Sequence, residues 1–122
     1  MTKTIVITGS TKGIGYGLAK EFLKRGHNVV VSGRNQERLD KAVETLSEND
    51  KDRVAGCLCD VTSYEANENL FTFAKDKFGR VDIWINNAGV AHTMTNVSDL
   101  PMDKIHEVVD VNVYGSIYGS RV

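Results

Sequence analysis

Short apolar runs alternate along the chain with longer stretches in which apolar residues recur at helical spacing. The runs are three to six residues long and rich in β-branched side chains, which is typical of strands buried in a sheet. In the longer stretches, apolar residues return at every third or fourth position, as on one face of a helix. The pattern predicts strands at residues 5–7, 29–31, 54–59 and 81–85, and helices at 16–23, 35–48, 64–78 and from 101 to about 113.

Local signals predict where these helices begin and end. Gly26 is placed to end the first helix, and Ser63 is a suitable N-cap for the third, which Gly79 then ends. Pro101 suits the first turn of the last helix, where its missing N–H costs nothing. We expect that helix to thin out from Gly115 through Gly119 to the end of the chain.

Strands and helices alternate strictly in this prediction, and the alternation indicates one α/β domain. Parallel strands joined by right-handed helical crossovers form a doubly wound sheet with helices on both faces. A flavodoxin-like sheet shares this alternation, so periodicity alone leaves two fold types open. The chain of 122 residues is long enough for one such core, and residues 1–122 are expected to form a single domain.

A glycine-rich turn follows the first predicted strand. Residues 8–15 read Thr-Gly-Ser-Thr-Lys-Gly-Ile-Gly, and the first helix follows directly. Glycines permit a tight turn and close approach of a diphosphate, and the helix N-terminus offers free N–H groups. A Walker loop is excluded, because no Gly-Lys-Ser/Thr follows at the required distance. The turn therefore favours the dinucleotide-binding, Rossmann-type sheet, with strand order 3-2-1-4.

Composition and charge narrow the possible partners. The 15 basic and 16 acidic residues nearly cancel, which argues against binding to nucleic acid or to an acidic membrane. No apolar run is long enough to span a bilayer, and we expect no signal peptide at the start of the chain. The two cysteines, Cys57 and Cys59, are expected to be buried structural thiols, since no further ligands complete a metal site. We therefore expect a cytoplasmic protein without a bound metal.

Further motifs connect the glycine turn to a known family. The fourth predicted strand ends in Asn-Asn-Ala-Gly at residues 86–89, Asp60-Val61 follows the third, and Asn112 lies in the last helix. Together with the Thr-Gly-x-x-x-Gly-x-Gly turn, these motifs resemble those of the short-chain dehydrogenase/reductase family. The resemblance extends over the whole chain but includes only the first half of the family's domain. Residues 84–89 and 115–117 are also similar to the chlorophyll b reductase branch.

The resemblance implies how a nicotinamide dinucleotide is bound. The turn would line the diphosphate, Asp60 and Val61 the adenine, and the segment after the fourth strand the nicotinamide-side ribose. Asp60 has a plainer alternative role, which is to end the strand and cap the next turn of the chain. Asn87 is expected to be scaffold, and Asn112 would be catalytic by binding a water in the proton relay. The expected cofactor contacts are Gly9, Ser10, Thr11, Lys12, Gly13, Ile14, Gly15, Arg34, Asn35, Asp60, Val61, Asn86, Ala88 and Gly89.

The end of the second predicted strand indicates which nicotinamide cofactor binds. An Asp or Glu about 20 residues beyond the glycine motif reads the bare ribose of NAD(H). This position holds Ser-Gly-Arg-Asn at residues 32–35, with no carboxylate before Glu37. Arg34 can clasp a 2′-phosphate with its planar fork, Lys12 adds a second cation, and Asn35 can donate a hydrogen bond. We therefore expect NADP(H) to be preferred over NAD(H).

The rest of the family's catalytic machinery has no match in these residues. The family uses a Ser, and a Tyr followed four residues later by a Lys, all after a fifth strand. The one Tyr-x-x-x-Lys present, from Tyr16 to Lys20, precedes the second strand and is interpreted as coincidence. We therefore expect the cofactor-binding half of an NADP(H)-dependent oxidoreductase that acts on a small-molecule carbonyl or alcohol substrate. The isolated chain is expected to be inactive.

A non-catalytic dinucleotide-binding module or scaffold stays open as the alternative function. Left unpaired, the fourth strand at 81–85 presents an apolar edge that invites pairing with another chain, so a homo-oligomer is one expected outcome. His92, in the loop after residue 89, is placed to touch a ligand, although a solvated loop histidine is the simpler interpretation.

Overall fold

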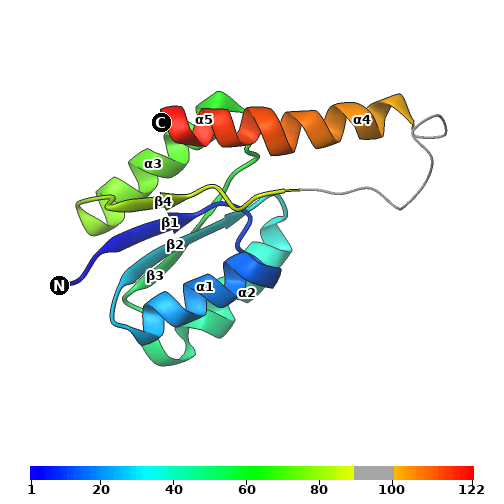
Figure 1. Cartoon of the computed structure of the whole chain (residues 1–122). Helices are drawn as coiled ribbons and strands as arrows, with labels where there is room; N and C mark the ends of the chain where they lie inside the picture. The colour runs from blue at the N-terminus through cyan, green and yellow to red at the C-terminus, as the bar shows by residue number, and fades with distance from the viewer. Residues whose placement is uncertain (90–100) are drawn as a thin grey trace.

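The computed structural model describes residues 1–89 and 101–122, and it has helices on both sides of a central sheet (Figure 1). Its strands are β1 (Thr4–Ile7), β2 (Asn28–Gly33), β3 (Val54–Leu58) and β4 (Ile83–Ile85). Its helices are α1 (Gly13–Lys24), α2 (Gln36–Asp50), α3 (Tyr64–Phe78), α4 (Met102–Val109) and α5 (Gly115–Arg121), with a π-helical segment, η2 (Asp110–Tyr114), between the last two. Every strand and helix predicted from the sequence is present.

The strands form one parallel sheet in the order β3-β2-β1-β4, which confirms the predicted Rossmann-type topology. In this register Val6 of β1 lies between Val30 of β2 and Trp84 of β4. Within the described part of the chain, β4 pairs only with β1, so its other edge is open. Ile83 on this strand is 37% exposed.

Alternate side chains of the central strands enter two cores, one on each face of the sheet. Ile5 and Ile7 face α1 and α2, whereas Val6 and Val30 face α3 and the C-terminal helices. Side chains 29–31 are fully buried, as expected for a β-branched run in the middle of a parallel sheet. Burial of each such side chain contributes about 1.5–3 kcal/mol.

Three of the predicted helix ends are confirmed, at Ser63, Gly79 and Gly26. The Ser63 hydroxyl accepts a hydrogen bond from the Ala66 amide at 3.2 Å and so caps α3. Gly79 ends that helix at φ +82°, and Gly26 follows α1 at φ +85°, both in the left-handed region that favours glycine.

The C-terminal helix corrects the prediction that it thins out from Gly115. The chain instead passes through η2 and continues as α5, with Gly115 and Gly119 buried. A Cβ on Gly115 would lie 2.6 Å from Val61 Cγ2, and one on Gly119 would overlap Asn86. Glycine costs a helix about 1 kcal/mol relative to alanine, which is why local propensity predicts an end. Here the absent side chains let α5 approach the sheet closely, and that packing outweighs propensity.

Candidate functional site

The glycine turn lies between the carboxyl end of β1 and the start of α1. Gly9 and Gly13 adopt φ values of +62° and +64°. A Cβ on Gly9 would lie 2.6 Å from the Cα of Ala88, whereas one on Gly13 would meet nothing within 4 Å. The first glycine is therefore required by the fold around it, and the second leaves open space beside the start of the helix.

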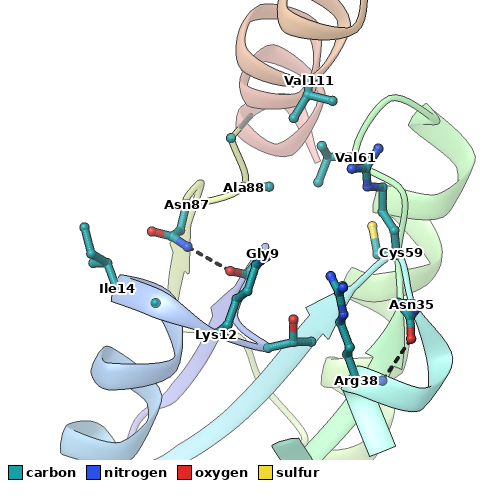
Figure 2. Close-up of a pocket in the computed structure, with 15 residues that line it drawn as sticks. Gly9, Lys12, Ile14, Asn35, Arg38, Cys59, Val61, Asn87, Ala88 and Val111 are labelled. Carbon is teal, nitrogen blue, oxygen red and sulfur yellow. Dashed lines mark hydrogen bonds between the residues drawn. The ribbon is translucent and has the colours of Figure 1, made fainter. Parts of the chain in front are cut away.

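Hydrogen bonds join this turn to the segment that follows β4. Thr8 Oγ1 accepts from the backbone amides of Asn87 and Ala88 at 3.0 and 3.1 Å. The Asn87 side-chain amide donates to the Gly9 carbonyl oxygen at 3.0 Å (Figure 2). These contacts fix the two loops to each other and give Asn87 a scaffolding role.

Ser10 forms hydrogen bonds to the two neighbouring strands β1 and β2. It is fully buried, and its hydroxyl donates to the Ile7 carbonyl oxygen at 2.7 Å. The Ser10 hydroxyl oxygen also accepts from the Ser32 amide at 3.0 Å, and the Ser10 amide donates to the Ser32 carbonyl oxygen at 2.9 Å. Both polar groups are thus used to hold the turn against β2, and a direct contact from Ser10 to a cofactor stays a prediction.

A cavity of about 640 Å³ opens at the carboxyl ends of the strands, beside the glycine turn. Ten of the expected cofactor contacts line it: Gly9, Thr11, Lys12, Gly13, Ile14, Arg34, Asn35, Val61, Ala88 and Gly89. The expected residues outside this lining are Ser10, Gly15, Asp60, Asn86 and Asn112. Five lining residues were missed by the sequence prediction of cofactor contacts: Gly33, Arg38, Cys59, Asn87 and Val111.

The charge of the cavity is positive. Lys12, Arg34 and Arg38 line it, and none of the described lining residues is acidic. In Figure 2, Arg38 points into the cavity from the start of α2, beside Asn35. The Asn35 side chain caps this helix by accepting from the Arg38 amide at 2.9 Å. The cap is visible in the sequence, and it places position 38 one turn above the loop, but the amphipathic pattern alone assigns Arg38 to solvent.

Part of the cavity wall is apolar. Val61, Cys59 and Val111 are each less than 5% exposed and belong to the same core cluster. Figure 2 shows Val111 descending from the C-terminal helix toward Val61. Val111 lies in the π-helical segment η2. Segments of π-helix are rare and often mark functional sites.

Two expected contacts have structural partners instead. One carboxylate oxygen of Asp60 accepts from the Thr62 amide at 3.0 Å and from the Thr62 hydroxyl at 2.7 Å, which is the capping role left open by the sequence. Asn86 accepts from Trp84 Nε1 at 2.9 Å and donates to Ser120 Oγ at 2.9 Å, so it ties β4 to α5. Cofactor contacts from Asp60 and Asn86 stay predictions.

Asn112 lies on η2 near the segment after β4. Its side chain is exposed, and a Cβ on Gly89 would lie 3.2 Å from Asn112 Oδ1. Asn112 is therefore next to the cavity, although it does not line it. His92 lies outside the described residues.

Tyr16 and Lys20 do not approach this cavity. They line a second cavity of about 540 Å³ between α1 and α2, together with Leu23, Leu46 and other residues of those helices. The formal Tyr-x-x-x-Lys match is thus on a different surface, as its interpretation as coincidence requires.

The two cysteines differ in burial. Cys59 is 3% exposed and Cys57 is half-buried, and both are free thiols. Burial raises the pKa of the Cys57 thiol. Burial also raises the pKa of the Cys59 thiol to about 12, with smaller contributions from the neighbouring Cys57 and Asp60. No group of three or more His, Cys, Asp or Glu residues suited to a metal ion occurs in the described ranges.

Cys59 is therefore expected to react slowly with thiol reagents. At pH 8 a thiol with that pKa is ionised in only about one molecule in ten thousand, and the thiolate is the reactive form. The Cys57→Ser variant leaves Cys59 as the only thiol, and its rate with an aromatic disulfide reagent measures this directly. We expect slow reaction in the folded protein and fast reaction in denaturant. Equal rates in both conditions would contradict the burial of Cys59.

Comparison with known proteins places the whole chain in one sequence family. The profile of the family described as short chain dehydrogenase matches residues 3–122. Chlorophyll(ide) b reductase NOL, chloroplastic, from Arabidopsis thaliana is 44% identical over 112 residues, which are 91% of this chain and 32% of the relative. Dehydrogenase/reductase SDR family member 4 from Caenorhabditis elegans is 36% identical over 87% of this chain and 42% of the relative. The chain thus spans about a third of the length of the chloroplastic relative.

Solved structures of the same fold contain nicotinamide cofactors. A short chain dehydrogenase/reductase from Burkholderia phymatum in complex with NAD has a TM-score of 0.93, 30% identity, and coverage of 99% of this chain and 42% of that chain. A 3-ketoacyl-(acyl-carrier-protein) reductase from Brucella melitensis complexed with NADH has a TM-score of 0.90, 29% identity, and coverage of 98% and 48%.

These findings do not test the cellular location expected from the sequence. Among the described residues, no helix is both long enough and apolar enough to cross a bilayer. The chlorophyll(ide) b reductase relative is named as chloroplastic, so a cytoplasmic location stays a prediction.

Proposed function

Because this chain belongs to the short-chain dehydrogenase family, we propose that its cavity binds NADP(H) for hydride transfer to or from a carbonyl or alcohol substrate. The observation that carries the cofactor choice is the charge of the cavity lining, which holds three cations and no described carboxylate. A 2′-phosphate adds negative charge that arginine forks bind bidentately. The two solved relatives hold NAD and NADH, so the preference rests on this lining.

The lining fits the parts of a dinucleotide. Gly9 and Gly13 bring bare backbone to the start of α1, where N–H groups and the helix dipole favour a diphosphate. Val61 and Val111 offer an apolar wall suited to an adenine ring, and the cations Lys12, Arg34 and Arg38 line the same cavity. The nicotinamide, when bound, supplies or accepts the hydride.

Residues in and beside the lining would hold water and fix the position of the loops. We assign Asn112 to hold a water of the proton relay, on the basis of its place beside Gly89. Asn87 and Thr8 fix the segment that would lie under the nicotinamide-side ribose. Since Tyr16 and Lys20 are on a different surface, the proton donor is not among them, and the isolated chain is proposed to bind cofactor without turnover.

The substrate class proposed is a small-molecule carbonyl or alcohol compound. Similarity to a chlorophyll(ide) b reductase makes chlorophyll(ide) b the first carbonyl compound to assay with the protein. The alternative is a non-catalytic dinucleotide-binding module, in which the cavity holds the cofactor without hydride transfer.

Titration with NADPH and NADH, followed by cofactor fluorescence, tests the proposal. Hydrogen bonds to a charged group are worth about 1.5–3 kcal/mol, so we expect the Kd for NADPH to be at least about tenfold lower than that for NADH. The difference should shrink as salt is added, since the cations are partly exposed. Equal Kd values would contradict the assignment, and binding of neither cofactor would refute the function itself.

A further inference from the structure

An ion pair connects the cofactor cavity to α4. Arg34, which lines the cavity, has its Nη2 atom 3.9 Å from Oε1 of Glu107. Glu107 comes from a helix that Figure 1 shows beyond the ends toward which the strands point. A residue from the far part of the chain therefore neutralises one of the cations on which the NADP(H) assignment rests.

This pair is a weak one. A separation of 3.9 Å is too long for a hydrogen bond, and the side chains of Arg34 and Glu107 are 52% and 34% exposed. Exposed ion pairs of this kind contribute little, because water and salt screen them. A phosphate able to take both prongs of the guanidinium would hold Arg34 more strongly.

Glu107 also has a second cation within reach. Its other carboxylate oxygen, Oε2, lies 3.3 Å from Nζ of Lys104, one turn earlier on α4. Lys104 does not line the cavity. When Arg34 turns to another anion, Glu107 therefore keeps a partner on its own helix, and the exchange leaves no carboxylate without a counter-ion.

We propose that Glu107 is a displaceable counter-ion that competes with the 2′-phosphate of NADP(H) for Arg34 and so sets how strongly the cavity prefers that cofactor. The inference rests on the proposed function, since it assumes that NADP(H) enters this cavity. Glu107 acts on the affinity for NADP(H) through Arg34. It is therefore a residue that determines cofactor specificity, and it does not take part in the reaction itself. NAD(H), which lacks the 2′-phosphate, gains nothing from displacing it.

Removing the charge of Glu107 tests this competition. In Glu107→Gln we expect the Kd for NADPH to fall by about two- to fivefold at low salt, the range of an exposed ion pair, with the Kd for NADH unchanged. The gain should vanish near ~0.5 M salt, where screening is strong. Asp103→Asn is the matched control, because Asp103 is an exposed carboxylate on the same helix that forms none of the described ion pairs, and it should leave both Kd values unchanged.

A second variant is expected to change the affinity for NADPH in the opposite direction. Lys104→Met removes the alternative partner of Glu107, so Arg34 is held more firmly and NADPH should bind about twofold more weakly. Unchanged or weaker NADPH binding in Glu107→Gln would overturn the proposal, as would an equal gain for NADH. If the parent protein prefers NADPH and Glu107→Gln is silent, only this inference fails. If the parent protein shows no preference, the proposed NADP(H) specificity fails with it.

Discussion

Replacing Gly9 by alanine is expected to lower the free energy of unfolding by about 2–4 kcal/mol and to abolish measurable cofactor binding. Two costs add at this position. The left-handed φ of +62° disfavours any side chain, and the new Cβ would lie 2.6 Å from the Cα of Ala88. Ala88 cannot move away freely, because its amide donates to Thr8 Oγ1 at 3.1 Å. Urea unfolding followed by circular dichroism measures the stability, and NADPH titration measures the binding.

Two other glycines serve as controls for Gly9. Gly13 has nearly the same φ, +64°, but open space around the missing Cβ, so Gly13→Ala should cost only the conformational strain of about 1–2 kcal/mol. Gly17 lies within α1 and is also open, so Gly17→Ala should stabilise by about 0.5–1 kcal/mol. If Gly9→Ala costs no more than Gly13→Ala, the close approach to Ala88 does not constrain the turn.

The central fold is predictable from sequence because its signals are local. The β-branched run at Val29, Val30 and Val31 is fully buried in β2, as its composition requires. The Ser63 cap and the left-handed Gly79 mark the ends of α3 through bonds to residues only a few positions away. Each of these signals can be recognised from neighbouring residues in the sequence alone.

The parts of the site that sequence patterns miss depend on distant packing. Asn86, whose contact with the ribose stays a prediction, also bonds through its side chain to Ser120 on a helix whose position the sequence pattern does not give. Val111 lines the cavity from η2, a segment that departs from the regular helical turn. The periodicity of α2 assigns Arg38 to solvent, and Arg38 is in fact exposed while also lining the cavity. Helical periodicity distinguishes core from surface, but it does not distinguish a cavity wall from free solvent.

The continuation of the last helix beyond Gly115 has the same physical origin. Local propensity counts Gly115 and Gly119 as unfavourable, and it has no means of counting the approach to Val61 that Gly115 permits. A prediction made from the sequence therefore ends the helix too early. The effect of these glycines on the helix can be predicted only when the residues packed against them are known.

Removing both arginines of the cavity is expected to have the largest effect on cofactor choice. In the double variant Arg34→Ala and Arg38→Ala, the Kd for NADPH should rise about 100-fold, because each lost bond to a charged phosphate costs about 1.5 kcal/mol or more. The Kd for NADH should change less than about threefold, since the glycine turn and the apolar part of the cavity wall are unchanged. Both side chains line the cavity, and neither belongs to the buried core, so the fold should persist.

A matched control separates this local effect from the loss of net charge. Arg25→Ala removes one positive charge at the end of α1, where Arg25 pairs with Glu21 at 3.0 Å, away from the cavity lining. It should leave both Kd values nearly unchanged. The single variant Arg38→Ala should weaken NADPH binding about tenfold, which tests the cation that the sequence pattern assigns to solvent. If the double variant weakens NADPH and NADH equally, the arginines contribute a general attraction for anions, and the 2′-phosphate is not what they recognise.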